Sequence, residues 1–335
     1  MSSLAVSSGD PAGIGLEIAL KAWQQRHSRH IPAFFVLADA DIVEKTISLL
    51  NMDVRMAFVE ADEAAEKFED SFPVVPLHNR QSALPGQPSS KNAAGIVEAI
   101  ERGVHYVHDK EATALVTCPI AKKILYEAGF HFPGHTEFLA DLAEKLNGKH
   151  CQPVMMLAGP QLRTIPVTVH IAIEKVPHTL TKELLVETGL IVAHDLSERF
   201  AIKNPRLAVA GLNPHAGEDG AMGLEEENII KPAMEILRSR GINVIGPLPS
   251  DTMFNARARK NYDVALCMYH DQALIPVKTI GFDDTVNVTL GLPFIRTSPD
   301  HGTAFDIAGK GIASPESFIA ALTLADKLAQ NSLPS

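Results

Sequence analysis

Short apolar runs recur along this chain of 335 residues, and stretches with helical spacing separate them. This pattern is typical of alternating strands and helices with a largely parallel sheet, and it argues against an all-helical or an all-β fold. We expect strands at residues 4–7, 33–37, 114–117, 154–157, 164–169, 206–210, 264–268 and 286–290. We expect helices at residues 15–27, 41–50, 91–108, 137–146, 181–200, 225–240 and 315–329. The proline-rich stretch 71–90 is expected to be an extended connection.

The composition excludes several classes of protein. Hydrophobic residues make up 46% of the chain and charged residues 21%, which excludes a disordered, collagenous or coiled-coil protein. The length favours two domains or one large α/β unit. The net charge of −10 argues against a protein that binds nucleic acids or anionic membranes, because such proteins are usually basic. An anionic substrate must therefore be met by a few placed cations.

The cysteines and the hydropathy pattern predict a cytoplasmic protein. Cys118, Cys151 and Cys267 have no C-x-x-C spacing, which argues against a disulfide framework and a thiolate zinc site. Residues 1–10 contain no Lys or Arg before their short apolar stretch, so we expect no secretory signal there. No window approaches the roughly 18–20 apolar residues of a membrane-spanning helix.

Three histidines, His170, His215 and His270, lie at or just beyond the ends of apolar runs. Ligands of open α/β sheets collect outside the carboxyl ends of the strands, so these side chains could converge. Three neutral imidazoles that leave open positions describe a catalytic divalent-cation site. The alternative is ordinary hydrogen-bonded or surface histidines, because the chain has 14 of them. Residues 211–220 are dense in turn-forming residues and form either a rigid site loop or a simple strand-to-helix turn.

Acidic and glycine-rich segments near these runs have two interpretations each. Asp271 could orient His270 or cap the next helix. The acidic run at residues 225–227 is adequately explained by a helix dipole. Residues 9–15 follow the first strand but lack the third glycine of a dinucleotide-binding turn, which favours a plain tight turn.

A dianionic phosphate requires cationic, amide and hydroxyl donors. The chain offers these donors in Lys278, Arg296, Asn287 and Thr136. Individually, each is adequately explained as a surface cation, a strand residue or a helix cap. Residues 300–315 are rich in glycine and small side chains, so the backbone there could approach a ligand closely or simply form a loop before a helix that Pro315 begins.

At these positions the chain resembles the 4-hydroxythreonine-4-phosphate dehydrogenase family of pyridoxal phosphate biosynthesis. The specific matches are residues 211–217, 268–272 and 291–302, and the resemblance runs from residues 9–15 to the C-terminal helix. Residues 306–313, Asp-Ile-Ala-Gly-Lys-Gly-Ile-Ala, also resemble the dinucleotide loop of isopropylmalate and isocitrate dehydrogenases. The resemblance implies their two-domain α/β fold, with a mostly parallel sheet and an inter-domain cleft. We expect a dinucleotide-side domain at residues 1–130 plus 280–335 and a metal, substrate and dimerisation domain at residues 131–279.

The resemblance also implies roles for individual residues. His170, His215 and His270 would bind one divalent cation, Zn, Mg or Co, in a site completed across a homodimer interface. The implied substrate contacts are His135, Thr136, Lys278, Asn287 and Arg296, and the implied contacts to NAD or NADP are Gly302, Asp306, Gly309 and Lys310. Lys278, Asp251 and Asp271 are the candidate catalytic proton acceptors, and the residues do not choose among them.

The implied reaction is the NAD(P)-dependent, metal-dependent oxidation of 4-phosphooxy-L-threonine to 2-amino-3-oxo-4-phosphooxybutanoate. That product decarboxylates to 3-amino-2-oxopropyl phosphate in pyridoxine 5′-phosphate biosynthesis. The nearest alternative is a related dehydrogenase acting on 4-phospho-D-threonate or 4-phospho-D-erythronate. A metal-dependent hydrolase or aldolase and a non-catalytic phosphate-binding protein are the alternatives from other classes.

Overall fold

The computed structural model describes residues 3–132 and 134–332 and packs as two units. The first unit runs to Pro153 and resumes over Leu292–Gln330, and the second spans Val154–Gly291. The expected division at residue 130 separates helix α7 (His135–Asn147) from the first unit. In the structure α7 lies with that unit, because Phe138, Leu139 and Ala143 are buried in the unit's hydrophobic core.

The first unit contains parallel strands in the order β3-β4-β2-β1-β5-β12. Their bounds are β1 (Ser3–Ser7), β2 (Phe34–Ala38), β3 (Met56–Phe58), β4 (Phe72–Pro76), β5 (Ala112–Thr117) and β12 (Arg296–Pro299). The helices of this unit are α1 (Gly15–Gln24), α2 (Arg26–Arg29), α3 (Ala40–Leu49), α4 (Ala64–Lys67), α5 (Ala93–His108), α6 (Lys122–Glu127), α7 and α13 (Glu316–Asn331). The parallel strands and interleaved helices confirm the predicted α/β class.

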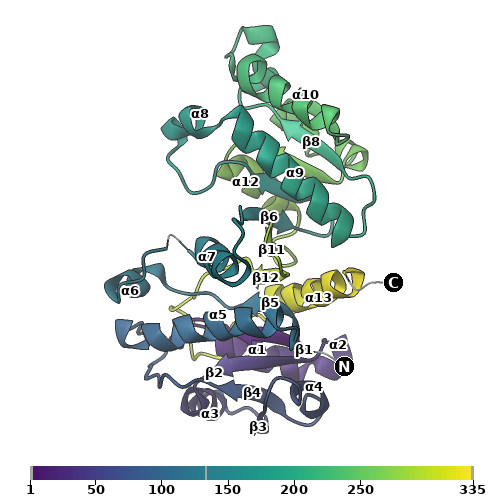
Figure 1. The fold of residues 1–335 in the computed structure, drawn as a ribbon. Coiled ribbons are helices and arrows are strands. Elements are labelled where there is room, and N and C mark those ends of the chain that lie inside the picture. Colours follow the sequence, from purple (N-terminus) through teal and green to yellow (C-terminus); the bar gives the residue numbers. More distant parts are fainter. Residues whose placement is uncertain (1–2, 133, 333–335) are drawn as a thin grey trace. The chain divides into compact units, whose positions relative to one another are not determined.

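Helices cover both faces of these strands (Figure 1). Successive strand residues point to opposite faces, and Phe34 and Phe35 of β2 show this directly. Phe35 belongs to the core formed with α5 and α7, whereas Phe34 packs edge-on against Phe318 of α13 at a centroid distance of 6.1 Å. Each face of the strands therefore has its own apolar layer.

Strand β4 lies in the stretch that we expected to be a connection. Its prolines, Pro73 and Pro76, lack the N–H that a ladder needs, which is why the sequence pattern argues against a strand here. The structure pairs β4 with β2 through Val74 and Val75, and with β3 through Phe72, Pro73 and Val74. Just after β3, the Val59 N–H donates to the Val74 carbonyl at 3.1 Å. Burial of Phe72, Val74 and Val75 stabilises the strand and offsets the hydrogen bonds that the prolines cannot make.

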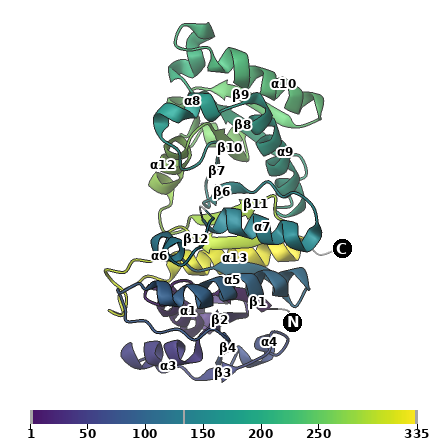
Figure 2. The same ribbon diagram turned by 60° about the vertical axis from the view of Figure 1, so that its left-hand side comes forward.

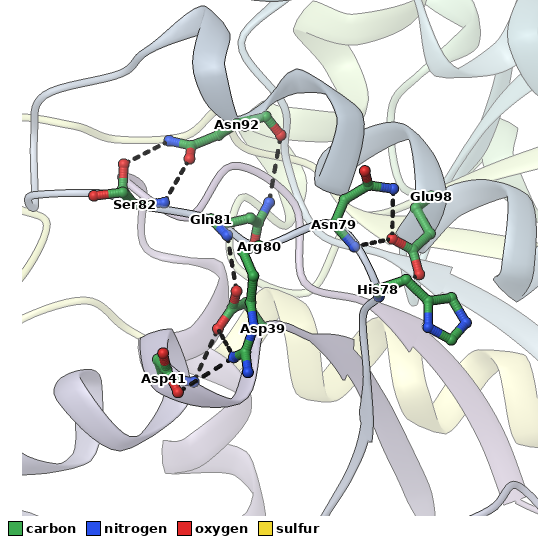
Figure 3. A network of polar contacts seen from close by, with 9 residues as sticks. All are labelled: Asp39, Asp41, His78, Asn79, Arg80, Gln81, Ser82, Asn92 and Glu98. Carbon is green, nitrogen blue, oxygen red and sulfur yellow. Dashed lines mark hydrogen bonds and ion pairs between the residues drawn. The ribbon is translucent and has the colours of Figure 1, made fainter.

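The loop after β4 is fixed by buried polar side chains rather than by regular structure (Figure 3). Glu98 of α5 accepts hydrogen bonds from the backbone N–H groups of His78 and Asn79, both at 2.8 Å. Asp39 accepts from the Gln81 N–H at 2.7 Å, and the Asn92 side chain accepts from the Ser82 N–H at 2.8 Å. The connection from β4 to α5 is thus held at several points.

Replacing Glu98 by glutamine is expected to lower the free energy of unfolding by about 2 kcal/mol at neutral pH, because an amide cannot satisfy both N–H donors as a carboxylate does. Burial alone raises the pKa of Glu98, but the hydrogen bonds from His78, Asn79 and Arg102 outweigh it and the pKa is lowered. The contribution is therefore present above the unfolded-state pKa and is lost as the pH falls through the lower folded-state pKa. Urea unfolding from pH 7 to pH 3 measures this, with Glu66→Gln, whose side chain is 82% exposed, as the control. Equal stability of the two variants at pH 7 would contradict the assignment.

The second unit contains strands in the order β11-β6-β7-β10-β8-β9. The pairs β11–β6 and β6–β7 are antiparallel, and β7, β10, β8 and β9 are parallel. Their bounds are β6 (Val154–Ala158), β7 (Arg163–Pro166), β8 (Arg206–Ala210), β9 (Asn243–Leu248), β10 (Val264–Cys267) and β11 (Val286–Leu290). The helices are α8 (Val176–Thr179), α9 (Lys182–Glu198), α10 (Lys231–Ser239), α11 (Ser250–Met253) and α12 (His270–Ile280). Figure 2 shows these elements from a second direction.

Helices α9 and α10 pack closely at Gly189 of α9. A Cβ on this glycine would lie only 2.7 Å from the Leu237 side chain of α10. Helix α12 packs through Ala273 and Val277 into a separate apolar cluster with β8 and β10. Among the residues that the structure describes, no helix combines the length and apolar character that crossing a bilayer would require.

Candidate functional site

The parallel strands β7, β10, β8 and β9 bring their carboxyl ends to one edge of the second unit. The segment after β7 carries His170, that after β8 carries His215, and that after β9 carries Asp251. His270 follows β10 and begins α12. The predicted sheet thus explains why side chains remote in sequence share one edge.

His170 and His270 lie beside each other, with ring centroids 5.3 Å apart and planes inclined by 43°. They line a pocket of about 230 Å³. The other lining residues are Thr168, Ile171, Ile173, Val176, Tyr269 and Asp271. The Thr168 hydroxyl donates to the Met268 carbonyl at 2.7 Å, which ties the segment after β7 to the segment that precedes His270.

Asp271 defines the orientation of the His270 ring. Its Oδ1 lies 2.7 Å from Nδ1 of His270. A carboxylate accepts, so this contact assigns the proton to Nδ1 and leaves the Nε2 lone pair available for a cation. Of the two interpretations of Asp271 from the sequence, orientation of a ligand is the one that this contact favours.

His215 lies in a left-handed stretch of backbone that the sequence did not predict. The five residues from His215 to Asp219 all have positive φ, from 43° at Glu218 to 83° at Gly217. A left-handed conformation costs an ordinary L-residue roughly 1–2 kcal/mol. In residues 3–132 and 134–332 of a single chain, no three His, Cys, Asp or Glu side chains form a group that could hold a metal ion. A single chain therefore brings His170 and His270 together but does not complete a three-ligand site with His215.

Gln272 joins the segments of this edge. Its Oε1 accepts from the Met268 N–H at 2.6 Å, and its Nε2 donates to the Gly211 carbonyl and to the Ser250 hydroxyl, both at 2.7 Å. The residue is buried. One side chain thus links the segments that precede His270, His215 and Asp251.

Arg296 is a buried cation in the first unit. Its side chain is 3% exposed, and its Nε and Nη2 donate to the Thr117 hydroxyl at 3.2 and 2.7 Å. Burial lowers the pKa of Arg296 to about 10, and the charge of Glu137 opposes that shift. The guanidinium therefore stays charged at neutral pH.

The N-terminus of α7 lies in the same region of the first unit. Its N-cap, Gly134, supplies no side-chain hydrogen bond to the first turn. Burial lowers the pKa of His135 well below its ordinary value, and the charges of Arg296 and Lys122 lower it further. Nε2 of His135 is buried without a hydrogen-bond partner in the described part of the chain. A neutral ring, a guanidinium and uncapped helix amides are the donors that bind a phosphate.

The remaining predicted substrate contacts are placed as follows. Thr136 lies in the first turn of α7. Lys278 lies in the last turn of α12, with Nζ 5.7 Å from the centre of the Phe282 ring. Asn287 lies on β11, where its buried Oδ1 has no partner among the described residues. Lys278 and Asn287 belong to the second unit, whereas His135, Thr136 and Arg296 belong to the first.

The predicted cofactor residues lie in a turn-rich segment that contacts two other loops. The Thr303 carbonyl accepts from the Ile14 N–H at 3.1 Å, and Gly86 lies against the segment, since a Cβ on Gly86 would lie 2.8 Å from the Phe305 carbonyl oxygen. Gly309 has a φ of 72°, and a Cβ there would lie 2.8 Å from Pro85. Gly302, Asp306 and Lys310 are exposed. The exposed backbone and side chains of this segment remain accessible to a ligand.

Two residues near these sites were missed by the sequence interpretation. Asp10 is 1% exposed, its pKa is raised by burial despite a hydrogen bond from the Ala12 N–H, and its Oδ2 has no partner in the described residues. Lys122 places its Nζ 3.3 Å from the position of a Cβ on Gly134. The glycine-rich turn around Asp10 was a detectable signal, but nothing local marks Lys122.

A histidine pair on one sheet edge, and a buried guanidinium beside a helix N-terminus, are features of α/β proteins that bind a cation and an anionic ligand. Residues 30–325 match the family described as pyridoxal phosphate biosynthetic protein PdxA. The chain belongs to this family.

Relatives in this family are similar over nearly their whole length. A 4-hydroxythreonine-4-phosphate dehydrogenase of Bradyrhizobium diazoefficiens is 54% identical over 334 residues, covering 97% of this chain and 96% of that protein. A protein of the same name from Methylorubrum extorquens is also 54% identical, covering 97% of this chain and 94% of that protein.

Solved structures show the same fold. The 4-hydroxythreonine-4-phosphate dehydrogenase from Klebsiella pneumoniae has a TM-score of 0.86 at 34% identity, covering 98% of this chain and 100% of that chain. A terephthalate 1,2-cis-dihydrodiol dehydrogenase from Burkholderia xenovorans has a TM-score of 0.66 at 25% identity, covering 97% of this chain and 98% of that chain.

Proposed function

We propose that this chain oxidises 4-phosphooxy-L-threonine at C3 with NAD or NADP as the oxidant. The observation that carries the proposal is the His170–His270 pair with its Asp271 partner, in a chain that is 54% identical over its length to proteins bearing that activity's name. The product, 2-amino-3-oxo-4-phosphooxybutanoate, then loses carbon dioxide to give 3-amino-2-oxopropyl phosphate.

The donor chemistry of the sheet edge fits a divalent cation such as Zn, Mg or Co. His170 and His270 stand side by side, and the Nδ1 contact to Asp271 leaves Nε2 of His270 as the ligand atom. With a cation bound by these residues and a third histidine, the C3 hydroxyl of the substrate would lose its proton more readily.

We propose that His215 of a second copy supplies the third ligand in a homodimer. Large apolar side chains are exposed in the second unit just after His170, in the segment between His215 and α10, and on or just after α12. They are Ile171, Ile173, Met222, Leu224, Ile275 and Phe282, with Phe282 70% exposed. An exposed apolar surface next to an incomplete ligand set is the pattern expected where a second subunit both covers the surface and completes the site.

The substrate phosphate is assigned to the first unit's buried donors. Arg296 supplies a fixed positive charge, and His135 supplies a neutral N–H donor at Nε2. The first turn of α7, which includes Thr136, supplies backbone N–H groups. Lys278 and Asn287 are proposed as further substrate contacts. Anchoring the phosphate uses binding energy to orient C3 for hydride transfer.

The proton of the C3 hydroxyl requires an acceptor. Because Asp271 is engaged with His270, we assign it to orientation, which leaves Asp251 and Lys278 as the candidate bases. Asp251 is exposed in α11, on the same sheet edge as the histidines. We assign the nicotinamide cofactor to the exposed segment with Gly302, Asp306, Gly309 and Lys310. Free thiols at Cys118, Cys151 and Cys267 are consistent with a cytoplasmic protein.

Absorbance at 340 nm during incubation with substrate and NAD+ or NADP+ tests the proposed reaction. We expect turnover with 4-phosphooxy-L-threonine and release of carbon dioxide. Turnover of 4-phospho-D-threonate or 4-phospho-D-erythronate without turnover of 4-phosphooxy-L-threonine would replace the proposed substrate by one of these. Substrate consumption without a change at 340 nm would place the chain in a different class of enzyme.

A further inference from the structure

The left-handed segment that carries His215 is built around one buried carboxylate. Glu226, which is 1% exposed, is the first residue of a π-helical turn, η4 (Glu226–Ile230). Its Oε1 accepts from the Asn213 N–H at 2.8 Å, and its Oε2 accepts from Nδ2 of Asn213 at 2.9 Å. The carboxylate therefore holds the residue two positions before His215 through both its backbone and its side chain.

The glycines of the segment leave room for this carboxylate. A Cβ on Gly217 would lie 2.7 Å from Oε2 of Glu226, and a Cβ on Gly211 would lie 3.2 Å from Oε1. Gly211 also lies against Ala216, whose Cα would be 2.7 Å from that same Cβ. The segment thus packs closely against the Glu226 carboxylate, and its residues 215–219 all have left-handed backbone angles.

We propose that Glu226 is a positioning residue for His215, which keeps the imidazole in the orientation needed to bind the divalent cation. This inference rests on the proposed function, because it takes His215 as a metal ligand. Of the acidic run 225–227, the partly exposed Glu225 also accepts from Nδ2 of Asn213, at 2.7 Å, and Glu227 pairs with Lys231. Glu226 alone of the three is fully buried and accepts from both the backbone and the side chain of Asn213, which a helix dipole does not explain. Groups that orient metal ligands typically influence metal affinity by roughly 10- to 100-fold.

The variant Glu226→Gln tests the proposal, because its amide keeps the side-chain volume but presents N–H groups to the donors of Asn213. The matched control is Glu227→Gln, which removes the same charge one residue later and affects an ion pair with Lys231 instead. The full-length protein is titrated with Co2+, and the affinity and the ligand-field absorption of the bound ion are measured. The thermal midpoint of the metal-free protein is measured in parallel.

We expect Glu226→Gln to weaken Co2+ binding by roughly 10- to 100-fold and to change the ligand-field spectrum, while Glu227→Gln matches the wild type. Gly217→Ala places a methyl group against the Glu226 carboxylate and should have the same two effects. This variant replaces Glu226→Gln in the test if Glu226→Gln does not fold. Wild-type affinity and spectrum in the variant that folds would overturn the proposal. So would a lowered thermal midpoint without any change in Co2+ affinity or spectrum, since this indicates a purely structural role.

His215→Ala separates the two levels of inference. If the wild type binds Co2+ and His215→Ala weakens that binding, the metal assignment holds and the Glu226 result judges the positioning role alone. If His215→Ala binds Co2+ as the wild type does, His215 is not a ligand, and both the metal assignment and the Glu226 proposal are overturned.

Discussion

Replacing Arg296 by alanine is expected to lower kcat/KM for the phosphorylated substrate by about 10³-fold while the KM for NAD+ changes little. The guanidinium is buried and charged, so its loss removes a desolvated charge from the site, and losses of this kind cost about 4 kcal/mol or more, equivalent to about 10³-fold. Steady-state kinetics with each substrate varied in turn measures both effects.

Arg163→Ala is the matched control for Arg296→Ala. Arg163 is a partly buried guanidinium whose pKa is lowered by burial, but it donates to the Asp263 carbonyl at 3.1 Å and contacts the Phe200 ring. The Arg163→Ala variant should lower stability without a selective loss of kcat/KM for the phosphorylated substrate. Equal losses for the phosphorylated substrate and NAD+ in Arg296→Ala would show that the phosphate binds elsewhere.

Removal of the divalent cation, or of any one of His170, His215 and His270, is expected to reduce turnover by at least about 10³-fold, because the proposed cation would supply the positive charge that favours loss of the C3 hydroxyl proton. Dialysis against a chelator followed by readdition of Zn, Mg or Co measures the dependence, and each His→Ala variant should resist rescue by the cation. The metal-free protein should retain its thermal midpoint to within a few degrees if the site is catalytic rather than structural. Full activity after exhaustive chelation would refute the metal assignment.

Much of the fold could be predicted because its strands are short apolar runs. Strands β1, β2, β5 and β8 are buried along most of their length, so each is a short and nearly continuous apolar run in the sequence. Strand β4 was missed because prolines in its sequence argue against pairing, which burial of Phe72 and its neighbours overrides. Strand β12 is short and ends in Pro299, so it too lacks a clear pattern.

The shared position of the three histidines could be predicted because each follows a strand. His170, His215 and His270 each follow a strand of the parallel set, so their shared edge follows from the topology. The left-handed conformation of residues 215–219 could not be predicted, since Ala216, Glu218 and Asp219 carry no local signal for it. Buried roles such as those of Glu226 and Gln272 depend on contacts between segments far apart in the chain, which spacing does not reveal.

The central claim is that one chain supplies His170 and His270 and a second chain supplies His215, and mixing inactive subunits tests it directly. A dimer of one His170→Ala subunit and one His215→Ala subunit has one intact ligand set, formed by His170 and His270 of the second and His215 of the first. Random reassortment of equal amounts should therefore restore about a quarter of the wild-type activity. The control mixture of His170→Ala with His270→Ala should stay inactive. In every dimer, each subunit then lacks either His170 or His270, so no site has both. Absence of recovery in the first mixture, or equal recovery in both, would contradict a site shared between subunits.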